Sequence, residues 1–248
     1  MYQAGVDVGR VSPVFITHHH VDHINDLYDV IFSTAGQGRE GTLPIYGPAG
    51  TQQIVDALLN GVYASDNRFR LEEEKEVRRQ GHSRHRRYET IHDVTVHEIG
   101  AGVAVEGDGW RVISDYVLHG DFPHAPDFEW HCLGYRIEAE DQVVTISGDT
   151  VPCPGISKLA HEADLLVQCC MWPESFLKAN PALRTLTESV LPSPYQAGQI
   201  AAEAGVKRMV LTHLSASISQ NNFEEVLADV RQHFQGEVLF GEDLLVIE

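Results

Sequence analysis

Six consecutive residues rich in metal-binding side chains constrain this sequence more than any other feature. The segment His18-His19-His20-Val21-Asp22-His23 follows an apolar run at 11–17, which predicts a buried strand, and precedes apolar residues at helical spacing. Imidazoles and a carboxylate on one strand-to-helix turn can converge on a single point, and they are ligands that zinc, iron and manganese sites use. A surface histidine run or a tag remnant is the alternative, but neither would follow an apolar strand or contain an aspartate.

Three further positions with ligand-type side chains each come at the end of a predicted strand. Asp149 follows the strand at 143–147, His213 follows 209–212, and His119 closes the strand at 110–118. An isolated aspartate or histidine after a strand more often serves a turn or a local hydrogen bond. Several such strand ends in one chain indicate a common site instead. His124 and His131 are alternatives to His119, because they also precede the strand predicted at 133–138.

The remainder of the chain alternates between strand-like and helix-like patterns. The predicted strands not yet given lie at 43–46, 94–99 and 165–168 and near Val238 and Leu245, and the predicted helices lie at 52–59, 195–204 and 223–234. No low-complexity linker or internal repeat interrupts this series, so the sequence predicts one mixed α/β domain over residues 1–248. The segment at about 65–90 has the weakest apolar pattern and predicts a charged helical insertion or mobile arm.

Charge limits the partners of the chain. The 248 residues carry a formal charge of −18, which argues against broad nucleic-acid binding because a phosphate backbone repels such a surface. Residues 68–87 are the exception, since they hold eight of the 18 basic residues and only four acidic ones. Two interpretations stay open for this segment: a solvated helix and loop, or a patch that attracts an anionic substrate.

The sequence also bears on the cellular compartment. No apolar run of about 18 residues occurs, so no transmembrane helix is expected, and the first ten residues lack the apolar stretch of a signal peptide. The four cysteines (Cys132, Cys153, Cys169 and Cys170) form no CxxC pair and no disulfide framework. This usage predicts a cytoplasmic protein without a membrane partner.

The histidine motif, together with Ser147-Gly148-Asp149-Thr150 and Leu211-Thr212-His213, resembles the metallo-β-lactamase superfamily. Within it, the chain is most similar to the branch that contains ribonuclease Z and related arylsulfatase-like and phosphodiesterase-like hydrolases. The resemblance covers nearly the whole chain. It implies an α/β fold, the four-layer αββα sandwich in which two mixed sheets are flanked by helices.

The resemblance further implies a site for two divalent metal ions, Zn²⁺ in the first place, with Mn²⁺ or Fe²⁺ as alternatives. One ion would be held by His18, His20 and His119, the other by Asp22, His23 and His213, and Asp149 would bridge them. Asp22 and Asp149 are the implied catalytic carboxylates. A hydroxide between the ions would attack the substrate, because metal coordination lowers the pKa of water towards neutrality.

Two departures from the ribonuclease Z pattern bear on the substrate. Gln168 and Cys169 stand where those enzymes have a His-Glu pair that assists proton transfer, and Leu191 stands where they have a histidine. With the negative charge, this argues against nucleic acid as the substrate. The two-metal hydroxide mechanism suits in-line attack on phosphorus or sulfur, and it favours a small anionic ester, either a phosphodiester or a sulfate ester. A lactone or carboxylic-ester hydrolase with the same site is the alternative.

A third departure concerns the start of the chain. Family members have strands before the region that corresponds to Gly5-Val6-Asp7, whereas this sequence begins just before it. The resemblance therefore predicts a metallo-β-lactamase fold that is truncated at its N-terminus. If the truncation disables the enzyme, the alternative function is that of a non-catalytic metal-binding remnant. The resemblance also suggests a homodimer.

Overall fold

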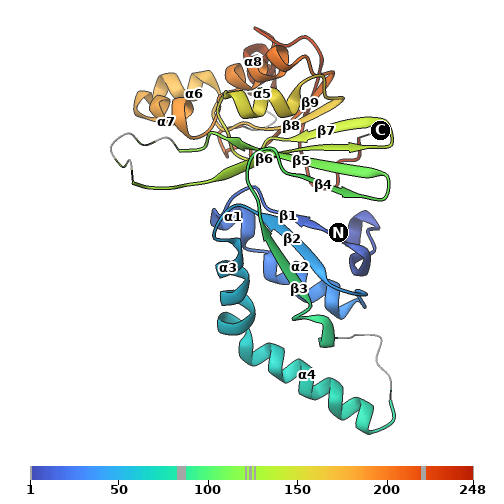
Figure 1. Cartoon of the computed structure of the whole chain (residues 1–248). Coiled ribbons are helices and arrows are strands. Elements are labelled where there is room, and N and C mark those ends of the chain that lie inside the picture. Colours follow the sequence, from blue (N-terminus) through green and yellow to red (C-terminus); the bar gives the residue numbers. More distant parts are fainter. Residues whose placement is uncertain are drawn as a thin grey trace. The chain divides into compact units, whose positions relative to one another are not determined.

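The computed structural model describes residues 2–82, 88–120, 122, 125, 127–218 and 222–247 (Figure 1). The chain divides into two compact units, Met1–Ile99 (unit 1) and Gly100–Glu248 (unit 2). Each unit has its own β-sheet and its own buried apolar cluster. The expectation of a single domain over residues 1–248 stays a prediction.

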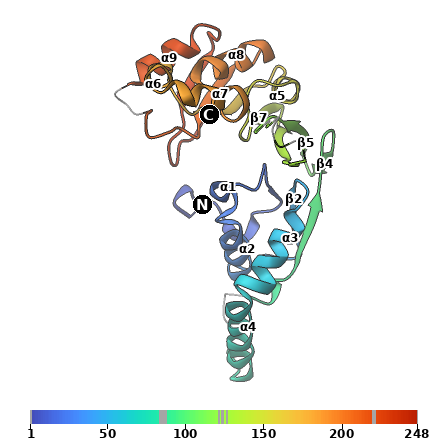
Figure 2. The ribbon, with the colours of Figure 1, turned by 90° about the vertical axis from the view of Figure 1, so that its left-hand side faces the viewer.

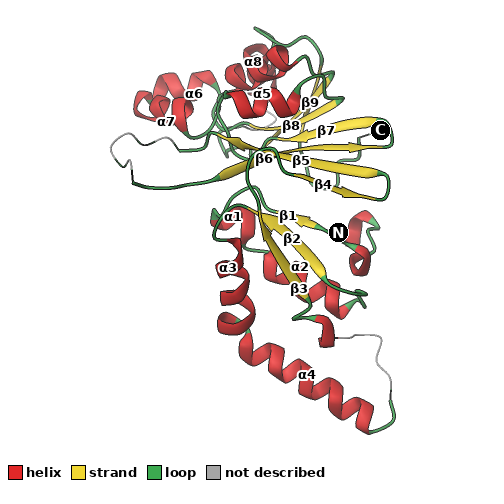
Figure 3. Ribbon diagram, in the orientation of Figure 1, coloured by secondary structure: helices red, strands yellow, loops and turns green. Residues whose placement is uncertain are grey.

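Unit 1 is built on a parallel sheet of order β1-β2-β3, with helices between successive strands (Figure 3). Parallel neighbours require a crossover, and the helices supply it. The strands are β1 (Val14–Phe15), β2 (Leu43–Gly47) and β3 (Val94–Glu98). The helices are α1 (Val21–Ile24), α2 (Leu27–Gly36), α3 (Thr51–Ala57) and α4 (Ala64–Arg79). Shorter helical turns are η1 (Tyr2–Ala4), η2 (Val8–Arg10), η4 (Tyr88–Thr90) and the π-helical η3 (Leu58–Val62).

The core of unit 1 lies between its sheet and helix α2. Leu43 and Ile45 alternate along β2 and are fully buried against Ile31 and Ala35 of α2. The described strands of this sheet are all parallel, so the expected mixed arrangement is not found in unit 1. Strand β1 is also shorter than the run predicted at 11–17. Pro13 has no N–H to donate to a ladder, and proline is therefore confined to the edges and beginnings of strands.

The charged segment forms helix α4, and its charges largely pair within the helix. The helix carries five basic and five acidic side chains, and its ion pairs include Lys75–Glu72 at 2.8 Å and Arg79–Glu76 at 2.8 Å. Asn67 fixes the helix to α2 by accepting a 2.6 Å hydrogen bond from the Tyr28 hydroxyl. Arg84, Arg86 and Arg87 lie outside the described residues. The described residues of the basic segment, 68–82, hold five basic and four acidic side chains, and this near balance weakens the interpretation as an anion-attracting patch.

Unit 2 contains a seven-stranded mixed sheet of order β10-β9-β8-β7-β6-β5-β4. Strands β4 to β7 pair antiparallel, and β7 to β10 pair parallel. The strands are β4 (Ala104–Gly107), β5 (Trp110–Val117), β6 (Cys132–Ala139), β7 (Gln142–Ile146), β8 (Leu165–Cys169), β9 (Arg208–Thr212) and β10 (Glu237–Phe240). The helices are α5 (Pro154–Ala160), α6 (Glu174–Ala179), α7 (Arg184–Ser189), α8 (Pro194–Ala204) and α9 (Phe223–Val230), with the turn η5 (Pro181–Leu183).

Helices α5, α8 and α9 gather on one side of this sheet (Figure 2) and enclose the second core. Ile156, Ile200 and Val226, one from each helix, pack there against Met209 and Leu211 of β9. Two differences from the sequence prediction occur in this unit. Strand β4 was not predicted, and the residues around Leu245 do not form the predicted strand. Among the described residues, no helix is both long enough and apolar enough to cross a bilayer.

Gly155 allows helix α5 to approach strand β5 closely. A Cβ added at this position would lie 1.8 Å from the carbonyl oxygen of Tyr116, which is backbone and cannot rotate away. We expect Gly155→Ala to lower the free energy of unfolding by about 1–3 kcal/mol, because the helix must shift off the sheet. Urea unfolding followed by circular dichroism measures this change.

Gly61→Ala is the control, because no atom lies within 4 Å of a Cβ added there. It should change the free energy of unfolding by less than about 1 kcal/mol. An unchanged unfolding midpoint in Gly155→Ala would show that α5 can move at little cost.

Candidate metal centre

Unit 1 brings together the four expected ligands of the histidine motif. The chain leaves β1, His20 takes an extended conformation as the N-cap of α1, and Asp22 and His23 lie within that helix. The buried His18 has its Nε2 3.1 Å from His20 Nδ1, and its ring centroid lies 4.1 Å from that of His23. The Asp22 Oδ2 atom is 3.5 Å from His23 Nε2. A turn this tight places the side chains at one point because all of them belong to a single short segment.

His19, in the middle of the motif, has a different partner. Its Nε2 lies 2.8 Å from the Thr51 hydroxyl, which also donates to the Pro48 carbonyl at the start of α3. Burial lowers the pKa of His19, and the carboxylate of Glu98 opposes this shift. His19 therefore joins the motif to α3, and its side chain is not among the clustered ligands.

Unit 2 brings together the remaining three expected ligands. Strands β7 and β9 both run parallel to β8, so Asp149 after β7 and His213 after β9 come to the same edge of the sheet. The Asp149 Oδ2 atom lies 3.4 Å from His213 Nε2 and 3.7 Å from His119 Nε2. One carboxylate oxygen thus stands near two imidazole nitrogens. Asp149 and His119 are buried, while His213 is partly exposed.

A backbone carbonyl orients His119. Its Nδ1 lies 2.7 Å from the carbonyl oxygen of Val190, and since a carbonyl can only accept, Nδ1 carries the proton. The other ring nitrogen, Nε2, is the one that lies near the Asp149 carboxylate. Metal-binding histidines usually donate their other N–H to such a group, which fixes the tautomer and the ring. Sequence reasoning missed Val190, because any residue type can supply a backbone carbonyl.

His131 and His124 were the alternatives to His119 as the third histidine ligand. His131 Nε2 lies 4.0 Å from the Glu129 carboxylate, and its ring packs against Tyr116. His124 lies outside the described residues. The assignment of His119 as a ligand stays a prediction, and its position beside Asp149 agrees with it.

The conformation of His213 is unusual for a residue with a side chain. Its φ of +55° lies in the left-handed region, where non-glycine residues carry strain. Strain of this kind concentrates at functional sites because the surrounding structure must hold the residue in place. Here it turns the side chain at the end of β9 towards Asp149.

Two buried thiols border the unit 2 ligands. Burial, followed by the charge of Asp149, raises the pKa of Cys169 to about 12, and the same two causes raise the pKa of Cys132 to about 12. Cys169 accepts a hydrogen bond from the Thr150 N–H at 3.3 Å. Its thiol therefore stays protonated near neutral pH.

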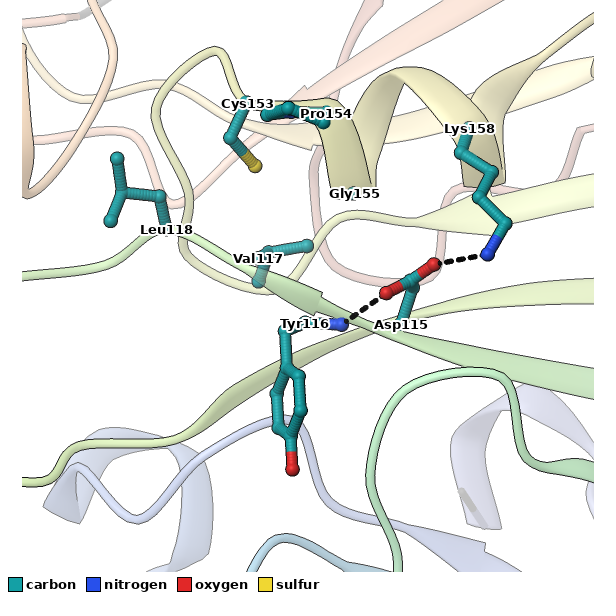
Figure 4. A pocket seen from close by; sticks show the side chains of 8 residues that line it. All are labelled: Asp115, Tyr116, Val117, Leu118, Cys153, Pro154, Gly155 and Lys158. Atoms are coloured by element: carbon teal, nitrogen blue, oxygen red, sulfur yellow. Dashed lines mark hydrogen bonds and ion pairs between the residues drawn. The ribbon is translucent and has the colours of Figure 1, made fainter.

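One hollow of unit 2 lies apart from the ligand set, between the end of β5 and the start of α5 (Figure 4). It measures about 440 Å³ and has a mainly apolar lining that includes Val117, Leu118 and Cys153. Lys158 and Asp115 form a 2.6 Å ion pair at its edge. None of the expected metal ligands lines it, so the structure gives this hollow no part in the centre.

The expected ligands thus form two half-sets, one in unit 1 (His18, His20, Asp22 and His23) and one in unit 2 (His119, Asp149 and His213). The chemistry of both half-sets fits divalent metal ions. Each consists of imidazole nitrogens and carboxylate oxygens, the donors that zinc, manganese and iron accept. The buried Asp149 carboxylate and the oriented His119 ring match this role, because a buried charge needs a compensating partner. All seven residues predicted from the sequence thus lie within one or other half-set.

Comparison with known proteins agrees with this description. Residues 3–214 match the sequence model of the "Beta-lactamase superfamily domain". A ribonuclease Z from Methanothermobacter thermautotrophicus is 30% identical over 287 residues, which cover 100% of this chain and 83% of the relative. The chain therefore belongs to the metallo-β-lactamase superfamily.

Solved structures support the same fold. The metallo-β-lactamase fold protein YhfI from Bacillus subtilis aligns with a TM-score of 0.65 at 21% identity, over 98% of this chain and 80% of that one. Human tRNase Z, short form, aligns with a TM-score of 0.61 at 19% identity, over 100% and 82%. The expected metallo-β-lactamase α/β fold is thus confirmed, and the chain is a metal-dependent hydrolase of this superfamily.

Proposed function

We propose that this protein is a dinuclear metal-dependent phosphodiester hydrolase. The observation that carries the proposal is the Asp149 oxygen, which lies near the Nε2 atoms of both His119 and His213. Asp149 would bridge two ions, with His18, His20 and His119 on one and Asp22, His23 and His213 on the other. Each half-set would need the other to complete the site. Zinc is the first choice of metal, with manganese and iron as alternatives.

When bound, the two ions would activate water near neutral pH and polarise the ester oxygens. The protein's own groups would set the geometry. The Val190 carbonyl holds the His119 ring, and the backbone at His213 holds the second imidazole against the carboxylate. These groups do not have to reorganise during the reaction, which is the main electrostatic advantage of a preformed site.

A phosphodiester is favoured over a sulfate ester, a lactone or a carboxylic ester. Relatives that match most of this chain are named ribonuclease Z, an activity on phosphodiester bonds. RNA is their substrate by name, whereas this chain carries a charge of −18. A small phosphodiester therefore fits the surface charge better.

The side chains at the end of β8, Gln168 and Cys169, favour substrates whose leaving group does not need a proton. The Gln168 amide cannot donate a proton as an acid, and the Cys169 thiol beside it is buried and accepts a hydrogen bond from the Thr150 N–H. A leaving oxygen of low pKa departs without protonation, so aryl diesters should react faster than alkyl diesters.

The test compares four substrates on one preparation: bis(p-nitrophenyl) phosphate, p-nitrophenyl sulfate, a γ-lactone and a precursor tRNA with a 3′ extension. We expect the aryl diester to be cleaved fastest, chelation to abolish turnover, and added Zn²⁺ or Mn²⁺ to restore it. Faster cleavage of the sulfate or the lactone would contradict the proposal, as would turnover that survives chelation. Faster cleavage of the tRNA would assign RNA as the substrate. The cytoplasmic location and the homodimer remain predictions.

A further inference from the structure

A row of aromatic side chains begins directly after His119, in the segment that joins β5 to β6. The row consists of Phe122, Phe128 and Trp130. The ring centroids of Phe122 and Phe128 are 6.4 Å apart, and those of Phe128 and Trp130 are 6.0 Å apart with planes inclined by 11°. The side chain of Phe128 is 55% exposed and that of Phe122 is 36% exposed. Two large aromatic rings therefore meet solvent side by side.

The row is anchored at its far end and shaped by local hydrogen bonds. Trp130 packs against the core of unit 2 and supports the Phe128 ring. The N–H of Ala125 donates to the Phe122 carbonyl at 2.8 Å, and the N–H of Phe128 donates to the Ala125 carbonyl at 3.0 Å. The exposed rings are thus held in position by the protein.

The near end of the row lies beside a metal ligand. A Cβ added at Gly120 would stand 3.0 Å from Phe122 Cε2, so this ring lies against the residue that follows His119. Residues 189–190 hold both the backbone beside the Phe122 ring and the His119 side chain. The Ser189 carbonyl accepts from the Gly120 N–H at 2.6 Å, and the Val190 carbonyl accepts from His119 Nδ1. The ring and the ligand are therefore fixed to one support.

We propose that Phe122 and Phe128 form a stacking subsite for a planar aromatic group esterified to the scissile phosphate. The inference rests on the proposed function and names its substrate class. Aromatic rings stack on one another through their faces and edges without any need for charge. An acidic protein can therefore hold a nucleobase or an aryl group in this way while the metal ions take the phosphate. Three rings are also too small a surface for a stable protein interface, which buries more than about 1,000 Å².

The test measures binding, so that it does not depend on turnover. The zinc-loaded protein is titrated by calorimetry with two matched pairs of ligands: uridine 5′-monophosphate against ribose 5-phosphate, and phenyl phosphate against methyl phosphate. Within each pair only the aromatic ring differs. We expect the ring to tighten binding by about 5- to 150-fold, the range measured for stacking of one base on an aromatic side chain.

Phe128→Ala should abolish this advantage and leave the binding of ribose 5-phosphate and methyl phosphate unchanged. Phe69→Ala is the matched control, since Phe69 is a similarly exposed phenylalanine on α4 and should have no effect. A preference in the first pair alone assigns a nucleobase, and a preference in the second alone assigns an aryl group.

Three results would overturn the subsite: no ring preference in the unmodified protein, a preference that survives in Phe128→Ala, or no binding of any ligand. A ring preference without diester hydrolysis would refute the proposed function and keep the subsite. Hydrolysis of the diester without a ring preference would refute the subsite and keep the proposed function.

Discussion

Asp149→Asn should reduce bound metal from close to two equivalents per chain to less than one and lower diester hydrolysis by on the order of 10³-fold. The substitution keeps the shape of the side chain and removes its negative charge. That charge stands 3.4 Å from the Nε2 atom of His213 and 3.7 Å from the Nε2 atom of His119. Elemental analysis of the purified protein gives the metal content, and hydrolysis of bis(p-nitrophenyl) phosphate gives the rate.

Asp115→Asn is the matched control for this experiment. Asp115 belongs to the same unit and forms an ion pair with Lys158, away from the ligands. It should keep both metal and activity. Full metal content and full turnover in Asp149→Asn would refute the bridging role, and a lost near-ultraviolet circular dichroism spectrum would instead show that the variant has not folded.

His18→Ala and His119→Ala should cause equivalent losses, although the two residues lie in different units. The proposal assigns both to one ion, so either variant removes a ligand from the same coordination sphere. We expect each to lose at least one metal equivalent and to lower turnover by on the order of 10²- to 10³-fold. Competition with a zinc indicator measures the affinity that remains.

His19→Gln is the control, because the His19 side chain lies on Thr51 and a glutamine can keep a hydrogen bond there. It should retain the metal affinity of the unmodified protein. If His119→Ala bound metal normally while His18→Ala did not, the ion would belong to unit 1 alone. The shared site would then be wrong.

Local sequence was sufficient to predict the ligand types. Four of the expected ligands lie within residues 18–23, where a strand-to-helix turn leaves little freedom in how the side chains converge. Asp149 and His213 could be assigned because each follows an apolar run typical of a parallel strand. Parallel neighbours in one sheet present their carboxyl ends at the same edge, so two such positions meet without further information.

Other features depend on contacts between distant parts of the chain. The Val190 carbonyl that orients His119 carries no sequence signal, since every residue has one. The aromatic row likewise exists because Trp130 reaches the core and supports Phe128.

The sequence by itself therefore identified the superfamily and predicted the ligand types and the strand ends that carry them. Such information is local, because residue type and periodicity decide it within a few residues. Only the tertiary structure decided the tautomer of His119 and the support that Trp130 gives to Phe128. Each of these rests on groups brought together from positions that no periodicity connects.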